Sequence, residues 1–340
     1  MGYEPFGTVL AGSADELRRA HDRWQALPVD QDLMAEGDTD GGFCEAETTL
    51  ARTVSVTGPG TFFGRTQRTL TFLPTEQKGW WFKRQELPEA LPIQVSVNNV
   101  WTTVRNIVLC SGSPHNYMRM VEHIVALKVG LGLDHVMISV DSGDPPLFDR
   151  GSMDLVEAIE SAGLARLGRA PRYLTVKEPV CMAGPRGGFL AFLPAARGVR
   201  RLAVDCAVDF RNAIGRQRIR FVVNAATFRH GALARTNTTL GMMLYCKTLG
   251  MIFADVRNLG YKPSNILVAG PRRYLNRPRL VHNGKSLEAV WHRAALDLLA
   301  AVALIERGRF AGTIVSYKAG HALDVALVRE VYRRDLLADL

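Results

Sequence analysis

Two apolar helical stretches, each followed by a strand-like run, constrain the fold of this chain most. The first lies within residues 118–129 and the second within residues 290–305, and in both the apolar side chains recur at helical spacing. Short runs of strand-forming residues follow them at 136–140 and 313–317. The chain therefore repeats one plan in its two halves: strands, then an apolar helix, then another strand.

The remaining expected elements fit the same plan. The first half has further strand candidates at 53–56, 69–73 and 93–97 and a second helix candidate at 153–161. The second half has strand candidates at 173–177, 189–193, 203–210 and 218–223 and a final helix candidate at 324–336. A basic link at 164–172 separates the halves, so we expect one domain over residues 50–165 and another over residues 170–335.

The bulk composition is that of an ordinary globular protein. Of the 340 residues, 47% are hydrophobic and 22% charged, which suits one or two domains with a sizeable core. No uninterrupted apolar run approaches the roughly 20 residues needed to span a bilayer, and no signal peptide is expected. The five cysteines are scattered without a CxxC motif, which favours a reduced, cytoplasmic location.

The net charge of +9 favours anionic partners. Nucleotide diphosphates, nucleic acid and an anionic membrane surface all belong to that class. No nucleic-acid-binding motif accompanies the charge, so we expect no nucleic-acid partner. Peripheral contact with an anionic surface is compatible with the charge.

Residues 1–49 differ from the rest of the chain. A helix is expected over residues 14–27, because Ser13 and Glu16 have the spacing of a capping box. The acidic, Gly-rich residues 30–47 are expected to form a mobile linker. The favoured interpretation is a surface appendage without chemistry.

Four side chains on and after the two apolar helices suggest a metal-dependent hydrolytic site. A neutral imidazole such as His123 can bind zinc, and the adjacent carboxylate of Glu122 can take a proton from water. Such a pair also arises by chance, as a Glu beside a partly buried His. His292 and Asp297 would complete an open zinc set with His123, and a further histidine outside that set could act as general acid.

Three segments resemble the signature segments of a known family, the UDP-3-O-acyl-N-acetylglucosamine deacetylases of lipid A synthesis (the LpxC family). They are Val121-Glu122-His123, the run from His292 to Asp297, and SYKAGHAL at 316–323. The resemblance extends in order over about residues 50–330, through connecting segments such as RTLTFLP at 68–74 and LARTNTTLG at 233–241. It implies an α+β fold of two similar domains, packed as a β-α-α-β sandwich with helices between two sheets and a metal at the domain junction.

The resemblance also implies a reaction and its main residues. It implies a zinc-dependent amidase, with iron as the alternative metal, that removes an acetyl group from an N-acylated and nucleotide-linked amino sugar. His123, His292 and Asp297 would hold the metal. Glu122 would deprotonate the attacking water, and His321 would protonate the leaving amine.

Four further positions match the family's substrate contacts in part. Thr236 matches the residue that stabilises the oxyanion, but Asn237 stands where the family has Phe. Arg293 replaces a family Lys, and with Lys318 it is expected to hold a diphosphate or another anion. The alternative for Lys318 is a solvated surface lysine. Asn237 is counted among the expected substrate contacts.

The spacing of the second ligand pair departs from the family pattern of His-x-x-x-Asp. Asp297 lies five residues after His292, and the fourth position is Leu296. Five residues place two side chains roughly 140° apart on an ideal α-helix, which suits one metal poorly. A one-residue π-bulge within 293–296 would restore the geometry. Without it, the metal would have two protein ligands or would recruit water or His282.

A second departure concerns His321. The family has a carboxylate four residues after the metal-binding Asp, where this chain has Ala301, or Ala300 if the count starts at Leu296. A histidine without that partner is expected to lose orientation and to hold a proton less readily.

These departures favour a diverged relative that acts on a different N-acylated substrate over the lipid A enzyme itself. The alternatives are a non-catalytic binding protein with the same cleft and a metal enzyme with another reaction, such as dehydration or cyclisation. The Gly- and Pro-rich residues 181–198 lie where an acyl-binding insert is expected, and their composition does not decide whether an acyl passage is present.

Overall fold

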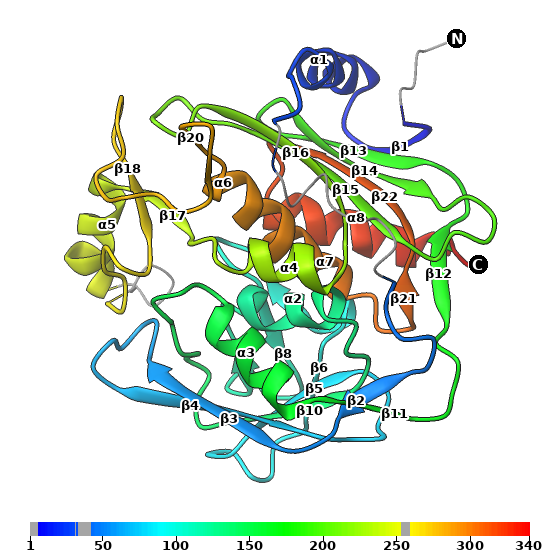
Figure 1. Ribbon diagram of the computed structural model, residues 1–340, viewed down its shortest axis with the longest axis vertical. Helices are drawn as coiled ribbons and strands as arrows, with labels where there is room; N and C mark the ends of the chain where they lie inside the picture. The colour runs from blue at the N-terminus through cyan, green and yellow to red at the C-terminus, as the bar shows by residue number, and fades with distance from the viewer. Residues whose placement is uncertain (1–5, 31, 33–41, 253–258) are drawn as a thin grey trace.

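The computed structural model describes residues 6–30, 32, 42–252 and 259–340. It has a six-stranded and a five-stranded sheet, and Figure 1 shows helices α2, α6, α7 and α8 between them. The expected mixture of α and β structure is confirmed. Within the described residues, no helix is both long and apolar enough to cross a bilayer.

The five-stranded sheet is built from the first half of the chain. Its order is β3 (Val54–Pro59), β4 (Gln67–Leu73), β10 (Val136–Val140), β5 (Trp80–Arg84) and β6 (Ile93–Gln94). Strand β10 runs antiparallel to β4 and parallel to β5. Alternate side chains of these strands, including Phe72, Trp80 and Ile138, are fully buried. This alternation is what a sheet with one face against the helices requires.

The six-stranded sheet is built largely from the second half. Its order is β1 (Thr8–Ala11), β13 (Val180–Gly184), β14 (Gly188–Pro194), β22 (Gly312–Tyr317), β15 (Leu202–Asp209) and β16 (Arg216–Val222). The central strands β14, β22 and β15 are buried along most of their length, because both faces of the sheet are covered. The helices cover one face and α1 (Ala14–Gln25) lies on the other (Figure 1).

The helices between the sheets carry the candidate site. They are α2 (Glu122–Gly130), α3 (Met153–Ala162), α4 (Ala225–Gly231), α6 (Glu288–Trp291), the π-helix η4 (His292–Leu298), α7 (Leu299–Ala303) and α8 (His321–Arg333). The helix expected over residues 290–305 is therefore a succession of α6, η4 and α7, with π-helical turns at its centre. Helix α2 packs against both α7 and η4.

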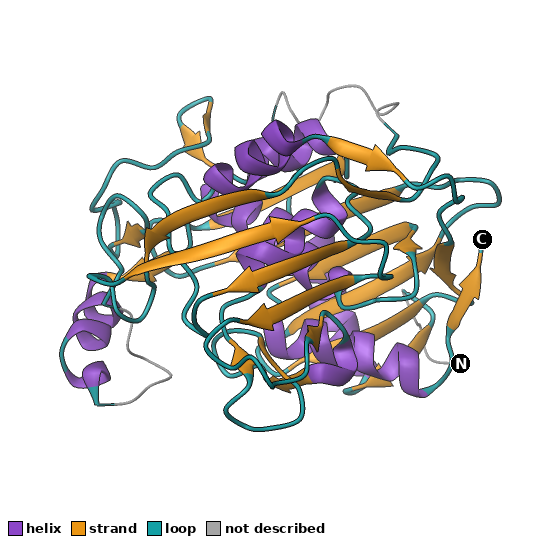
Figure 2. Ribbon diagram, turned by 90° about the horizontal axis from the view of Figure 1, so that it is seen from below, coloured by secondary structure: helices purple, strands orange, loops and turns teal. Residues whose placement is uncertain are grey.

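Shorter elements join and flank these layers. The short strands are β2 (Thr48–Leu50), β7 (Val100–Thr102), β8 (Val108–Cys110), β9 (Tyr117–Met118), β11 (Leu164–Arg166), β12 (Tyr173–Val176), β17 (Asn237–Thr239), β18 (Leu267–Ala269), β19 (Val281–His282), β20 (Lys285–Ser286), β21 (Arg309–Phe310) and β23 (Leu337–Asp339). Two 3₁₀ turns are η1 (Val97–Asn99) and η2 (Leu249–Met251), and α5 (Leu240–Lys247) follows β17. Helix α5 projects from the body of the molecule (Figures 1 and 2).

The N-terminal segment is part of the fold, so the expectation of a loose appendage is wrong, whereas its lack of chemistry stays a prediction. The expected capping box is present, with Ser13 and Glu16 bonded to each other's backbone at the start of α1. Strand β1 adds to the six-stranded sheet parallel to β13. Leu17 and Trp24 of α1 are buried in a cluster with Phe189 of β14. The apolar side of α1 thus packs on the six-stranded sheet. Sequence periodicity predicts such an apolar side but does not identify the sheet that it contacts.

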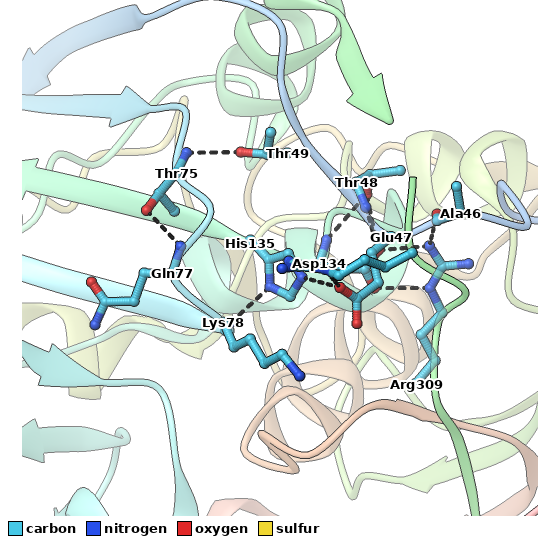
Figure 3. Close-up of polar contacts among 12 residues, drawn as sticks. Ala46, Glu47, Thr48, Thr49, Thr75, Gln77, Lys78, Asp134, His135 and Arg309 are labelled. Carbon is cyan, nitrogen blue, oxygen red and sulfur yellow. Dashed lines mark hydrogen bonds and ion pairs between the residues drawn. The ribbon is translucent and has the colours of Figure 1, made fainter. Parts of the chain in front are cut away.

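The described part of the expected mobile linker is also held in place (Figure 3). Arg309 donates to both carboxylate oxygens of Asp134 at 2.9 and 2.7 Å, and Asp134 accepts from the backbone N–H of Thr48 at 2.8 Å. Glu47 lies 3.0 Å from Nε2 of His135, whose Nδ1 accepts a backbone N–H. These contacts attach the segment around residues 44–48 to the loop after α2. The rest of the expected linker, residues 31 and 33–41, lies outside the described residues.

Residues 181–198, where an acyl-binding insert was expected, are regular sheet. They form most of the hairpin of β13 and β14 in the six-stranded sheet. One face of this hairpin packs beneath α1. Gly187 stands in the hairpin turn at a φ of +67°, which favours glycine, and the presence of an acyl passage, left open by the composition, stays undecided.

Candidate active site

The first turn of α2 presents the adjacent pair Glu122 and His123. Glu122 is only 3% exposed, and its carboxylate accepts a hydrogen bond from the backbone N–H of Ile107. Burial raises the pKa of Glu122, and the charge of His321 partly opposes that shift. A carboxylate with a raised pKa and a nearby cation is suited to accept a proton near neutral pH.

His123 faces His292 across the interface between α2 and the π-helix. Their Nε2 atoms are 3.2 Å apart. The hydroxyl of Thr236 lies 3.3 Å from Nε2 of His123 and 3.0 Å from Nε2 of His292. Ser152 lies 3.1 Å from Nδ1 of His123 and orients that ring from its other side. Burial, together with the charge of His292, lowers the pKa of His123 to about 3, so this imidazole is neutral.

The π-helix η4 accommodates the five-residue spacing between His292 and Asp297. A π-helix bonds residue i to residue i+5, so residues five apart lie about one turn from each other. Oδ1 of Asp297 accordingly lies 3.6 Å from His292, but from its Nδ1 atom, not Nε2. Burial acts to raise the pKa of Asp297, but His292, His321 and Arg293 together hold it well below its usual range.

The predicted set of His123, His292 and Asp297 does not converge on one point. Among the described residues, no three His, Cys, Asp or Glu side chains are grouped so as to hold a metal ion. Asp297 instead supports the far nitrogen of the His292 ring, as carboxylates behind metal-binding histidines do.

The two histidines themselves fit a metal well. Two nitrogens at zinc's usual bond lengths and a tetrahedral angle would lie about 3.3 Å apart. The observed separation is 3.2 Å, and His123 is held neutral, as a ligand must be. His282, considered as a substitute ligand, lies in the β19–β20 hairpin.

His321 begins α8 and has carboxylate neighbours after all. Its Nε2 lies 3.6 Å from Oε1 of Glu122 and 3.9 Å from Oδ1 of Asp297. Burial acts to lower the pKa of His321, but Asp297, Glu122 and Asp324 raise it above its usual value. The expectation that His321 holds a proton less readily is therefore wrong, because Asp297, Glu122 and Asp324 supply the charge that Ala300 and Ala301 do not.

Arg293 points inward, whereas Lys318 and Asn237 lie nearer the surface. Arg293 donates to both oxygens of Asp324, at 2.6 and 2.5 Å, and both side chains are buried. Its guanidinium thus has a partner within the protein. Lys318 is partly exposed at a φ of +50°, and its Nζ lies 5.9 Å from the ring of Tyr317. Asn237 is partly exposed at the start of β17.

Three residues near the site were missed by the sequence analysis. Ser152 and Asp324 are fully buried, and the position of Asp324 three residues after His321 was the available signal. Glu288 starts α6 and accepts bonds from both the backbone and the side chain of Arg235, the residue before Thr236. This buried ion pair ties the Thr236 segment to the helix that carries His292.

The site brings together two facing imidazoles, a hydroxyl, a buried carboxylate and a histidine with a raised pKa, and such a set is suited to hydrolysis. Comparison with known proteins gives the family. The model described as UDP-3-O-acyl N-acetylglycosamine deacetylase (LpxC) matches residues 47–333. The chain belongs to this family, and the resemblance seen in its signature segments is confirmed.

Curated relatives are similar at a modest level over most of their length. The UDP-3-O-acyl-N-acetylglucosamine deacetylase of Colwellia psychrerythraea is 26% identical over 289 residues, which cover 85% of this chain and 90% of the relative. The enzyme of that name from Trichormus variabilis is 28% identical over 293 residues, covering 83% and 97%. That from Xanthomonas campestris pv. campestris is 28% identical over 303 residues, covering 86% and 90%.

Proposed function

We propose that this protein removes the acetyl group from an N-acetylated amino sugar, with a UDP-linked, 3-O-acylated sugar as the first candidate substrate. The observation that carries the proposal is the convergence of His123, His292 and Thr236 beside Glu122 and His321. The family and the names of the relatives support the same reaction. His123 comes from the first half and His292 from the second, which supports a site at the junction of two similar domains.

His123 and His292 would hold a divalent metal, zinc or iron. Bound there, the metal would supply Lewis acidity toward the acetamide carbonyl and acidify water. Asp297 keeps the His292 ring oriented through Nδ1, and Ser152 does so for His123.

Glu122 and His321 divide the proton transfers. Glu122 takes the proton of the attacking water, for which its raised pKa is suited. His321 has a raised pKa, so it is protonated at the outset and can donate to the leaving amine. The hydroxyl of Thr236 donates a hydrogen bond to the oxyanion that develops on the carbonyl.

Arg293 is proposed here as a positioning residue. Its guanidinium fixes Asp324, whose charge supports the protonated form of His321. Binding of a substrate diphosphate would then fall to Lys318, with Asn237 near the sugar.

A metal-free binding protein is the second candidate. The observation that favours it is the lack of a third His, Cys, Asp or Glu donor at the two histidines among the described residues. Such a protein would retain substrate binding without turnover.

An assay of UDP-3-O-acyl-N-acetylglucosamine deacetylation, which measures the acetate released, tests the proposal. The metal-loaded wild type should turn over, and Glu122→Gln should lose at least about 100-fold in kcat. The exposed Glu157→Gln on α3 is the matched control and should be unchanged. If the metal-loaded wild type is inactive on this and on a panel of N-acetylated amino sugars, while calorimetry still detects binding, the binding-protein alternative holds.

A further inference from the structure

The N-terminal segment reaches the residue next to the candidate ligand His292. Asp32 is only 5% exposed, and its Oδ2 accepts a hydrogen bond from the indole Nε1–H of Trp291 at 2.8 Å. Trp291 is the last residue of α6 and directly precedes the π-helix that begins at His292. The family match begins at residue 47, so Asp32 belongs to the part of this chain outside it.

Asp30, two residues before Asp32, is held by hydrogen bonds to β16. Asp30 pairs with Arg218 through a backbone bond of 2.7 Å, and its carboxylate accepts the Arg218 backbone N–H at 2.9 Å. A second carboxylate oxygen of Asp30 accepts from Lys285 at 2.6 Å. The Arg218 side chain in turn donates to the carbonyls of Trp24 and Leu27 at the end of α1. The chain from the end of α1 to Asp30 is therefore fixed along the edge of the six-stranded sheet.

The indole of Trp291 is enclosed on its other sides. It is fully buried, with ring centroids 4.7 Å from Phe221 and 4.9 Å from His230. Nε2 of His230 lies 3.4 Å from the same carboxylate oxygen of Asp32. Gly231 packs so closely that a side chain there would collide with Ala295 and make a tight contact with Trp291. Asp32 is the acceptor of the buried indole N–H, and its removal would leave that N–H unsatisfied.

We propose that Asp32 is a positioning residue for the site: it fixes Trp291, and through Trp291 it sets where the π-helix presents His292. The inference rests on the proposed function, because His292 is assigned a role there. Trp291 directly precedes the first residue of the π-helix, so a displacement of the indole would be passed along the backbone to His292. The N-terminal segment supplies that anchor from outside the region matched by the family model.

The first test observes the histidines in the metal-free protein by NMR. The eight histidines give ring C–H resonances, and His292→Gln assigns the one of interest. In Asp32→Ala the His292 resonance should shift or split, whereas Asp32→Asn, which retains an acceptor oxygen for the indole, should keep it close to wild type. Asp22→Ala on the exposed side of α1 is the matched control and should leave it unchanged. A His292 resonance unaltered in Asp32→Ala, with the Trp291 indole N–H displaced, would overturn the positioning role and leave Asp32 as a packing residue.

The second test uses the metal and the reaction. Asp32→Ala should weaken zinc binding and lower kcat about 10-fold with KM unchanged, and Asp32→Asn should recover most of both. Equal affinity and kcat in Asp32→Ala and wild type would contradict the proposal. If the wild type neither binds zinc nor deacetylates, the proposed function fails, and the NMR comparison still decides whether Asp32 positions His292.

Discussion

Replacing Glu288 with alanine should destabilise the protein strongly, because this carboxylate is fully buried and both of its oxygens accept hydrogen bonds. It accepts the backbone N–H of Arg235 at 3.0 Å, the Arg235 Nε and Nη2 at 2.7 and 3.1 Å, and the backbone N–H of Arg279 at 2.6 Å. The substitution would leave the buried Arg235 guanidinium without its carboxylate. Breaking a buried pair in this way costs about 3–5 kcal/mol. The two carbonyls that Arg235 still contacts, of Pro263 and Arg277, place the expected loss toward the lower part of that range.

Urea denaturation at pH 7, analysed by linear extrapolation at an unchanged m-value, measures the loss. The matched control is Glu157→Ala, which removes an exposed pairing with Arg150 and should leave the unfolding free energy nearly unchanged. Glu288→Ala should also lower kcat, because the pair joins the Thr236 segment to the helix of His292. A loss below about 1 kcal/mol in Glu288→Ala would refute the reasoning that the pair holds these two segments together.

Two further predictions concern the interior around α2. Burial lowers the pKa of Lys128 from 10.5 to about 8, so the unfolded chain binds the extra proton between those values and the stability contributed by this site rises with pH across that window. The unfolding free energy of the wild type relative to Lys128→Met should therefore rise by about 3 kcal/mol between pH 7.5 and 10.5, and a flat difference would contradict the assigned burial. Gly130→Ala should cost about 1–3 kcal/mol in urea denaturation, because its new Cβ would lie 2.1 Å from the ring of Phe228. Gly241→Ala on α5 has open space around it and should be neutral or stabilising; equal effects at the two positions would contradict the packing.

The helical part of the site was largely predictable from the sequence. The sequence placed Glu122 and His123 in the first turn of an apolar helix, and the structure has them at the start of α2. The five-residue interval from His292 to Asp297 required a π-bulge for the two to share a face, and η4 supplies the π-helix. The spacing does not predict which ring nitrogen of His292 Asp297 approaches, since that depends on side-chain torsions.

Contacts between segments far apart in the chain were not predictable. The family pattern points only to positions 300 and 301 for a partner of His321, whereas Asp297 of η4, Glu122 of α2 and Asp324 of α8 provide the charge. Asp32 lies in an acidic, Gly-rich stretch whose composition is typical of a linker, and only the tertiary fold brings it to Trp291. Composition describes the average behaviour of a segment, and here one buried carboxylate departs from it.

The metal content of the purified protein tests the account most directly. Elemental analysis of the wild type, expressed with zinc supplied, should find about one metal ion per chain, and His123→Ala should find none. Asp297→Asn should bind more weakly, by about 10- to 100-fold, but should not lose the site, because the carboxylate contacts Nδ1 of His292. No metal in the wild type would contradict the assignment of His123 and His292 as a metal-binding pair.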